Sequence, residues 1–78
     1  MTAEYFKDIK KLIEEATGVD PSEITPDSYF EDDLNIGEME LIEIISELEE
    51  KFHVELMDKR EDIETVQDLV DLLSEQVE

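Results

Sequence analysis

Cysteine and tryptophan are absent from this sequence of 78 residues, and only two glycines and two prolines occur. Without thiols, disulfide frameworks, thiolate metal sites and cysteine nucleophiles are excluded. No stretch approaches the ~18 consecutive apolar residues of a membrane span, and no basic-then-apolar signal pattern opens the chain. We therefore expect a cytoplasmic protein, and the length predicts one domain over residues 1–78.

Positive charge is also scarce, since six lysines and arginines oppose 25 aspartates and glutamates, a formal net charge of −19. Phosphate backbones and anionic lipids repel such a chain, so we expect neither nucleic acid nor membrane as a partner. Basic protein surfaces attract it. The alternative interpretation is that the acidity serves only solubility or halophily. The distribution argues against it, because no lysine or arginine occurs from Leu12 to Glu50, whereas Lys7, Lys10 and Lys11 crowd the first segment.

Apolar residues at helical spacing predict three main helices, and no convincing strand is present. The helices run from about Ala3 to Thr17, from about Ile36 to Lys51 and from about Val66 to Val77. The charged segment from Met57 to Ile63 is long enough for one or two helical turns. The predicted inward residues are Phe6, Ile9, Leu12, Ile13, Ala16, Leu41, Ile44, Ile45, Leu48, Phe52, Val66, Leu69, Val70, Leu73 and Val77. These elements predict an all-α fold, a small four-helix bundle with a long first loop and a short third helix.

Residues that start or stop helices stand at most of these boundaries. Thr2 can cap the first helix and Gly18 can end it. Asn35, followed three residues later by Glu38, predicts a capping box at the start of the second helix. Thr65 is the expected cap of the last helix.

The loop from Val19 to Leu34 contains both prolines. Asp20 precedes Pro21 and Thr25 precedes Pro26, so each proline follows a residue that can cap a short helical turn. The apolar residues of the loop are Val19, Ile24, Tyr29, Phe30 and Leu34. We expect these side chains to hold the loop against the bundle.

Several segments together resemble the acyl carrier protein family. Residues 30–36, FEDDLNI, and the acidic run 38–52, which ends in EEKF, are similar to the family's F-x-x-D-L-G-x-D-S-L and its acidic helix ending in E-E-x-F. Residues 24–28, ITPDS, resemble the family's first loop, and residues 63–69, IETVQDL, resemble the start of its last helix. The resemblance covers nearly the whole chain in the right order, and it implies the four-helix fold of that family.

In that family a serine at the start of the second helix carries 4′-phosphopantetheine, whose thiol bears acyl or aminoacyl chains. The match puts Glu38 at that position, between Gly37 and Met39, so the family's D-S-L reads G-E-M here. A carboxylate does not accept the group by the usual transfer. Ser28 lies ten residues upstream and Ser46 lies two helical turns downstream, so neither replaces it. The resemblance implies 4′-phosphopantetheine for the family, but no cofactor is predicted for this chain.

Three interpretations of Glu38 remain open. As the third residue of a capped helix it completes the capping box and suits the positive end of the helix dipole, together worth ~1 kcal/mol. Alternatively, it presents a permanent negative charge where a carrier presents its phosphate. The third interpretation is that a natural serine was replaced, although Gly37 and Met39 argue against a single engineered change.

The second helix keeps the pattern with which the family binds partners, and the resemblance implies docking on basic grooves of synthases and transferases. Met39 and Ile42 lie off the buried stripe and are expected to face outward among carboxylates. The predicted partner-binding residues are Glu38, Met39, Glu40, Ile42, Glu43, Ser46, Glu49 and Glu50. A merely solvated helix face is the alternative, and a monomer is expected.

Catalytic and metal-binding patterns are not found. The segment from Asp27 to Glu38 has acids at both ends of 12 residues, but Asp32 stands where a calcium loop needs glycine. His53 is the only histidine and lacks partners in sequence for a metal site or an acid–base pair. We therefore expect neither an enzyme nor a dedicated metal site. The neighbouring acids Glu31, Asp32 and Asp33 are expected to attract divalent cations only loosely.

The function favoured by the sequence is an acidic module of the acyl-carrier type that docks on basic partner proteins through its second helix and lacks the attachment serine. The first alternative is a genuine acyl carrier protein whose serine was lost or replaced. A divalent-cation-binding protein is a distant second alternative.

Overall fold

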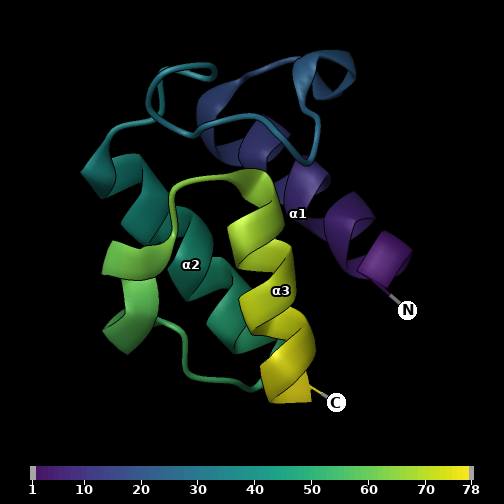
Figure 1. The fold of residues 1–78 in the computed structure, drawn as a ribbon, viewed down its shortest axis with the longest axis vertical. Helices are drawn as coiled ribbons and strands as arrows, with labels where there is room; N and C mark the ends of the chain where they lie inside the picture. The colour runs from purple at the N-terminus through teal and green to yellow at the C-terminus, as the bar shows by residue number, and fades with distance from the viewer. Residues whose placement is uncertain (1, 78) are drawn as a thin grey trace.

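The computed structural model describes residues 2–77, with side chains from residue 4 onward. Its elements are α1 (Thr2–Thr17), η1 (Pro21–Glu23), α2 (Glu38–Phe52), η2 (Met57–Asp62) and α3 (Val66–Val77), where η denotes a 3₁₀-helix (Figure 1). α1 packs against both α2 and α3, and η2 packs against α2. The predicted all-α bundle with a short third helix is confirmed. The β-type pairing among the described residues is an isolated bridge between Tyr29 and Thr65.

The core lies between the three long helices and is built from aliphatic side chains, with one aromatic ring from the loop. Its buried members are Ile9, Leu12, Ile13, Ile24, Phe30, Leu34, Ile36, Ile44, Ile45, Leu48, Leu56, Ile63, Val66, Leu69, Val70 and Leu73. The predicted inward faces are confirmed, with Phe6, Ala16, Leu41 and Phe52 partly buried against this cluster. Val77 is the exception, because it is 41% exposed in a final turn of α3 that extends beyond the cover of its neighbours.

The ends of α1 and α3 follow the sequence closely. Gly18 has a φ of 80° and its N–H donates to the Glu14 carbonyl at 2.8 Å, so it ends α1 as predicted. At α3 the Thr65 hydroxyl accepts from the Asp68 N–H at 3.1 Å, which confirms the predicted cap. α1 itself begins at Thr2, so Thr2 is the first helical residue rather than the cap before it, and its side chain lies outside the described residues.

The predicted capping box of Asn35 and Glu38 is wrong, because α2 begins two residues later than expected. Asn35 adopts a left-handed conformation with a φ of 55°, which asparagine tolerates better than most residues. Gly37 is the residue before the helix, and Glu40 supplies the carboxylate that accepts its N–H, at 3.4 Å. The capping box therefore begins at Gly37, two residues later than predicted, and the glycine has no side chain to contribute to it. The other end of α2 closes at His53, which is left-handed with a φ of 57°.

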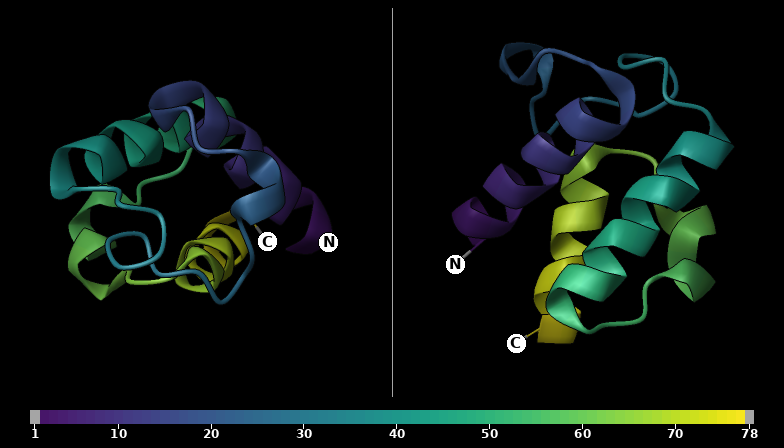
Figure 2. Two further views of the ribbon diagram at one scale, coloured as in Figure 1. Left: turned by 90° about the horizontal axis from the view of Figure 1, so that it is seen from above. Right: turned by 180° about the vertical axis from the view of Figure 1, so that it is seen from behind.

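The long loop crosses the end of the bundle at which α2 and α3 begin (Figures 1 and 2). Asp20 caps η1, as predicted, by accepting from the Ser22 N–H at 2.9 Å. The expected helical turn after Thr25 is instead a single hydrogen-bonded turn, closed by the Ser28 N–H and the Thr25 carbonyl. Of the predicted anchors, Ile24, Phe30 and Leu34 are buried and Val19 is partly buried, whereas Tyr29 is 46% exposed.

Backbone hydrogen bonds join this loop to the start of α3. The Phe30 N–H donates to the Glu64 carbonyl at 3.0 Å, and the Val66 N–H donates to the Ser28 carbonyl at 3.0 Å. The Gln67 N–H reaches back to the Pro26 carbonyl at 2.9 Å. These bonds fix the position from which the chain turns into α2.

The cap of α3 generates the first prediction. Partial burial raises the pKa of Asp68, but hydrogen bonds from the backbone N–H groups of Glu64 and Thr65 outweigh it and hold the pKa below its ordinary value. A depressed carboxyl pKa stabilises the fold above that ordinary value, and the stabilisation is lost as the pH falls through the folded-state pKa. Asp68→Asn is therefore expected to cost about 1 kcal/mol at pH 7 and progressively less below pH ~4.

Urea unfolding of both proteins between pH 7 and pH 2.5 measures this difference. Glu75→Gln, which changes an exposed carboxylate in the last turn of α3, is the matched control. A difference between parent and Asp68→Asn that stays constant across the series would contradict the assignment.

Candidate functional site

The chain enters α2 through an exposed turn, which is anchored to the core by buried residues of the preceding loop. The Ile36 N–H donates to the Phe30 carbonyl at 2.7 Å, and both side chains are buried. Gly37 follows in an extended conformation, with a φ of −77° and a ψ of 176°. Glu38 is then the first helical residue and is exposed. Because Glu40 rather than Glu38 completes the box, the capping interpretation of Glu38 is wrong, and only its favourable interaction with the helix dipole remains.

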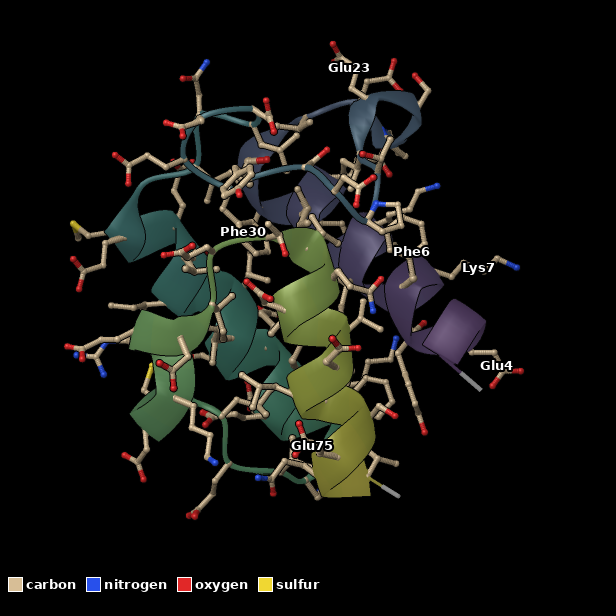
Figure 3. The ribbon with its side chains drawn as sticks, viewed as in Figure 1. Glu4, Phe6, Lys7, Glu23, Phe30 and Glu75 are labelled. Carbon is tan, nitrogen blue, oxygen red and sulfur yellow. The ribbon has the colours of Figure 1, made fainter. Side chains whose placement is uncertain are left out.

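An open groove of about 560 Å³ lies beside this corner, between the loop, α2 and η2. Its apolar lining comes from Tyr29, Phe30, Ile36, Leu41 and Ile63. Its acidic lining comes from Glu31, Asp32, Glu38, Glu61 and Glu64. Phe30 lies beneath the loop, next to the start of α3 (Figure 3).

Arg60 is the basic residue among those that line the groove. Its Nη1 donates to the Met57 carbonyl at 3.1 Å, which ties the guanidinium to its own 3₁₀-helix. Its Nε is buried and has no hydrogen-bond partner among the described residues. The Arg60 side chain as a whole is half-buried in the groove wall, and it keeps its positive charge there.

The eight predicted partner-binding residues do not form one uniform face. Met39 is 84% exposed, as expected of an outward apolar residue. Ile42 is half-buried rather than fully outward, because it lies next to the buried stripe. Exposed carboxylates are those of Glu38, Glu43 and Glu50, whereas Glu40, Ser46 and Glu49 are half-buried. The surface that remains available is therefore centred on Met39 and the exposed carboxylates around it.

Glu49 differs from the other acids of α2 because it bonds within the fold. Its Oε2 accepts from the Leu56 N–H at 2.8 Å and from the Met57 N–H at 3.0 Å. These donors open η2, so the carboxylate caps that 3₁₀-helix and holds it against α2. No local pattern announces this role, since the partners are seven and eight residues away and meet only after the chain turns at His53.

The other acidic residues show no convergence toward a cation. The Asp33 carboxylate accepts from the Tyr29 N–H at 2.8 Å and so closes a turn in the loop. Hydrogen bonds from the backbone N–H and the hydroxyl of Ser22 lower the pKa of Asp20, the residue that caps η1. Within residues 2–77, no three His, Cys, Asp or Glu side chains are grouped closely enough to hold a metal ion. The same residues contain no helix of the length and apolarity needed to cross a bilayer.

Comparisons with known proteins identify the class. Residues 7–73 match the family model described as the phosphopantetheine attachment site. The chain is 34% identical over 76 residues to the acyl carrier protein of Thermosynechococcus vestitus, covering 96% of this chain and 94% of that protein. Its fold is similar, with a TM-score of 0.82 and 26% identity, to the solution structure of the apo doublet acyl carrier protein from prodigiosin biosynthesis, covering 96% of this chain and 37% of that one.

The chain therefore belongs to the acyl carrier protein family. Members of this family are carriers without catalytic activity of their own, and they interact with biosynthetic enzymes. The prediction that the chain is not an enzyme agrees with this membership.

The family implies a phosphopantetheine group, and the residues at the start of α2 do not fit it. Attachment needs a hydroxyl, and neither serine nor threonine occurs from residue 29 to residue 45. Ser28 is only 7% exposed, and its hydroxyl is hydrogen-bonded to Thr25. Ser46 is half-buried in the third turn of α2. The exposed side chains in the first two positions of α2 are the carboxylate of Glu38 and the thioether of Met39, neither of which is a hydroxyl.

The contacts of Glu49 generate the second prediction. Glu49→Ala leaves two backbone N–H groups without their acceptor, and we expect it to lower the free energy of unfolding by about 1–2 kcal/mol. Glu50→Ala, which removes the exposed neighbour, is expected to change it by less than about 0.5 kcal/mol. Amide exchange at Leu56 and Met57 is expected to accelerate in the first variant only. Equal stability and equal exchange in the two variants would show that Glu49 is an ordinary surface acid.

Proposed function

We propose that this chain is an acyl-carrier-type module that docks on basic partner proteins through α2 and carries no phosphopantetheine. The observation that carries the proposal is the start of α2, where Glu38 presents an exposed carboxylate and neither serine nor threonine occurs from residue 29 to residue 45. Of the predicted partner-binding residues, Met39 and the carboxylates of Glu38, Glu43 and Glu50 remain exposed on α2. Such a module occupies or organises a partner as a scaffold or regulator instead of delivering cargo.

The exposed surface of α2 supports docking on a basic partner. Met39 offers an apolar contact, and Glu38, Glu43 and Glu50 offer carboxylates that are exposed to a partner. Acidic side chains project around the rest of the molecule as well, for example Glu4, Glu23 and Glu75 (Figure 3). A net charge of −19 raises the association rate with any basic surface and opposes contact between two copies, so we propose a monomer.

A genuine acyl carrier protein is the second candidate, and the comparisons favour it as a class. The matching family model is named for the attachment site and spans the segment in which Glu38 stands. Under this reading the residue at position 38 replaces a serine in an otherwise working carrier. The two candidates differ in whether the rest of the site still supports attachment once a hydroxyl is restored.

The third prediction concerns attachment. When the parent chain is incubated with coenzyme A and a broad-specificity phosphopantetheinyl transferase, we expect its mass to stay unchanged, because no hydroxyl stands at the start of α2. Glu38→Ser, tested alongside, is expected to gain one phosphopantetheine group if a transferase still recognises the fold. A mass gain by the parent chain contradicts the proposal, and peptide mapping would then locate the acceptor. A mass gain by Glu38→Ser alone would show that the side chain at position 38 is what prevents attachment in the parent chain.

The fourth prediction concerns docking. Glu43→Lys puts like charges in contact with a basic partner, and we expect binding to weaken about tenfold or more at low salt, with a smaller loss at high salt. Glu75→Lys makes the same charge change on α3 and is the matched control. The measurement is affinity for the protein that the immobilised chain recovers from a lysate, at two salt concentrations, with circular dichroism to confirm folding. Equal losses in both variants would mean that net charge, and no particular face, governs binding.

A further inference from the structure

Half of the chain's six basic residues lie together on α1. Lys10 and Lys11 stand three and four residues after Lys7, a spacing that places the three side chains next to one another on the helix surface. Lys7 and Lys11 are exposed and Lys10 is half-buried. Figure 3 shows Lys7 extending away from the body of the molecule. We call these three residues the lysine cluster.

The stability of α1 does not explain this cluster. Like charges three or four residues apart repel each other, so the cluster slightly destabilises its own helix. The negative end of the helix dipole favours lysines, but the last turn of α1 contains Glu14 and Glu15 and no basic residue. Among the residues that the structure describes, no carboxylate forms an ion pair with the cluster, whereas Lys51 pairs with Asp8. The charge of the cluster is therefore available to a partner.

The Phe6 ring holds one of these ammonium groups in place. The Nζ of Lys10 lies 5.2 Å from the centroid of the ring, which is a cation–π contact. Phe6 is partly buried against the core, so packing fixes the position of the ring. A contact with a ring face leaves the N–H donors of the ammonium group free to meet a carboxylate. One member of the cluster is thus ordered before a partner arrives.

We propose that the lysine cluster binds an acidic segment of the same partner protein whose basic surface docks on α2. The inference rests on the proposed docking function and adds the chemistry of a second contact. Carboxylates are the complementary groups, because an ammonium group has three donors and no acceptor. Contact through both helices selects a partner of mixed charge, since a uniformly basic surface would meet like charges at the cluster.

The net charge explains why the acidic segment belongs to a partner that α2 already holds. At a net charge of −19 the chain as a whole repels a free acidic protein. The attraction of three lysines is screened within about 8 Å at physiological salt, so another contact has to bring the segment close. α1 packs directly against α2, and the molecule measures 28 × 24 × 19 Å. An interface of ordinary size, about 800 Å² on each partner, is wide enough to reach both helices.

The test makes the same substitution at two exposed lysines. The probe is the protein that the immobilised parent chain recovers from a lysate, and its affinity is measured at two salt concentrations. Lys11→Glu is expected to weaken binding about fivefold at low salt and less at high salt, because a carboxylate then faces the acidic segment. Lys59→Glu, the matched control on η2, is expected to bind equally well or more tightly. Net charge alone predicts tighter binding by both variants, so the sign of the Lys11→Glu effect decides.

A milder substitution keeps the test valid if Lys11→Glu disturbs folding by circular dichroism. Lys11→Gln retains a good helix former at this position and removes only the positive charge. We expect it to weaken binding about twofold at low salt, because one attractive contact is lost and no repulsive one is added.

Carbodiimide coupling detects the contact directly, because the reagent joins an amino group to a carboxylate only where the two lie against each other. In the complex we expect links from Lys7 or Lys11 to aspartates or glutamates of the recovered protein, located by mass spectrometry. Lys51 and Asp8, with 3.3 Å between the Nζ and Oδ1 atoms, are the internal control. This pair is expected to couple in the free chain as well.

Other results overturn the inference in distinguishable ways. Tighter binding by Lys11→Glu, or coupling to the partner through the carboxylates of α2 alone, would exclude the cluster while docking on α2 stands. Links between isotope-labelled and unlabelled copies of the chain would assign the cluster to a second copy. Vesicles containing anionic lipid that retain the parent chain but release Lys11→Glu would assign it to a membrane. If the parent chain recovers no protein at low salt, the proposed docking function fails, and this inference fails with it.

Discussion

The backbone pairing between the long loop and the start of α3 is the constraint on which the functional end of the molecule depends. Main-chain hydrogen bonds join Phe30 to Glu64 and Ser28 to Val66. These bonds lie on either side of the bridge between Tyr29 and Thr65. With that segment fixed, the Phe30 carbonyl binds the Ile36 N–H and directs the chain into α2. The exposure of Glu38, the cap at Gly37 and one side of the groove all follow from this arrangement.

Carboxylates in this protein fall into two groups that composition does not distinguish. One group binds backbone N–H groups and so caps or closes local structure; its members are Asp20, Asp33, Glu40, Glu49 and Asp68. Most of the other carboxylates lie on the surface. One of them, that of Asp8, forms an ion pair with Lys51, with 3.3 Å between the Nζ and Oδ1 atoms. Because this pair is exposed to solvent, it contributes little to stability. The fold is stabilised by its aliphatic core and by these caps, while the unpaired acids give the molecule its field. That division leaves the acidic surface free for a partner without making the fold depend on it.

Membership in the acyl carrier protein family and the side chain of Glu38 point in different directions. The family model and the 34% identical relative describe a carrier. The start of α2 offers a carboxylate, and no capping role explains it, since Glu40 binds the Gly37 N–H. An exposed acid that contributes little to the helix is free to serve recognition.

Periodicity in the sequence determined the helices, their inward faces and the caps at Gly18, Asp20 and Thr65, because these depend on residues within one or two turns of each other. The resemblance of the motifs likewise predicted the family, which the comparisons show. Four features were decided only by the tertiary structure, because each involves residues far apart in the sequence. Two of them concern α2 itself: its cap lies at Gly37 instead of Asn35, and Ile42 is partly buried. The other two concern neighbouring segments: Glu49 accepts hydrogen bonds from the first N–H groups of η2, and a groove lies between the loop, α2 and η2. Each of these depends on where two separate segments meet in space, and local sequence does not specify such a meeting.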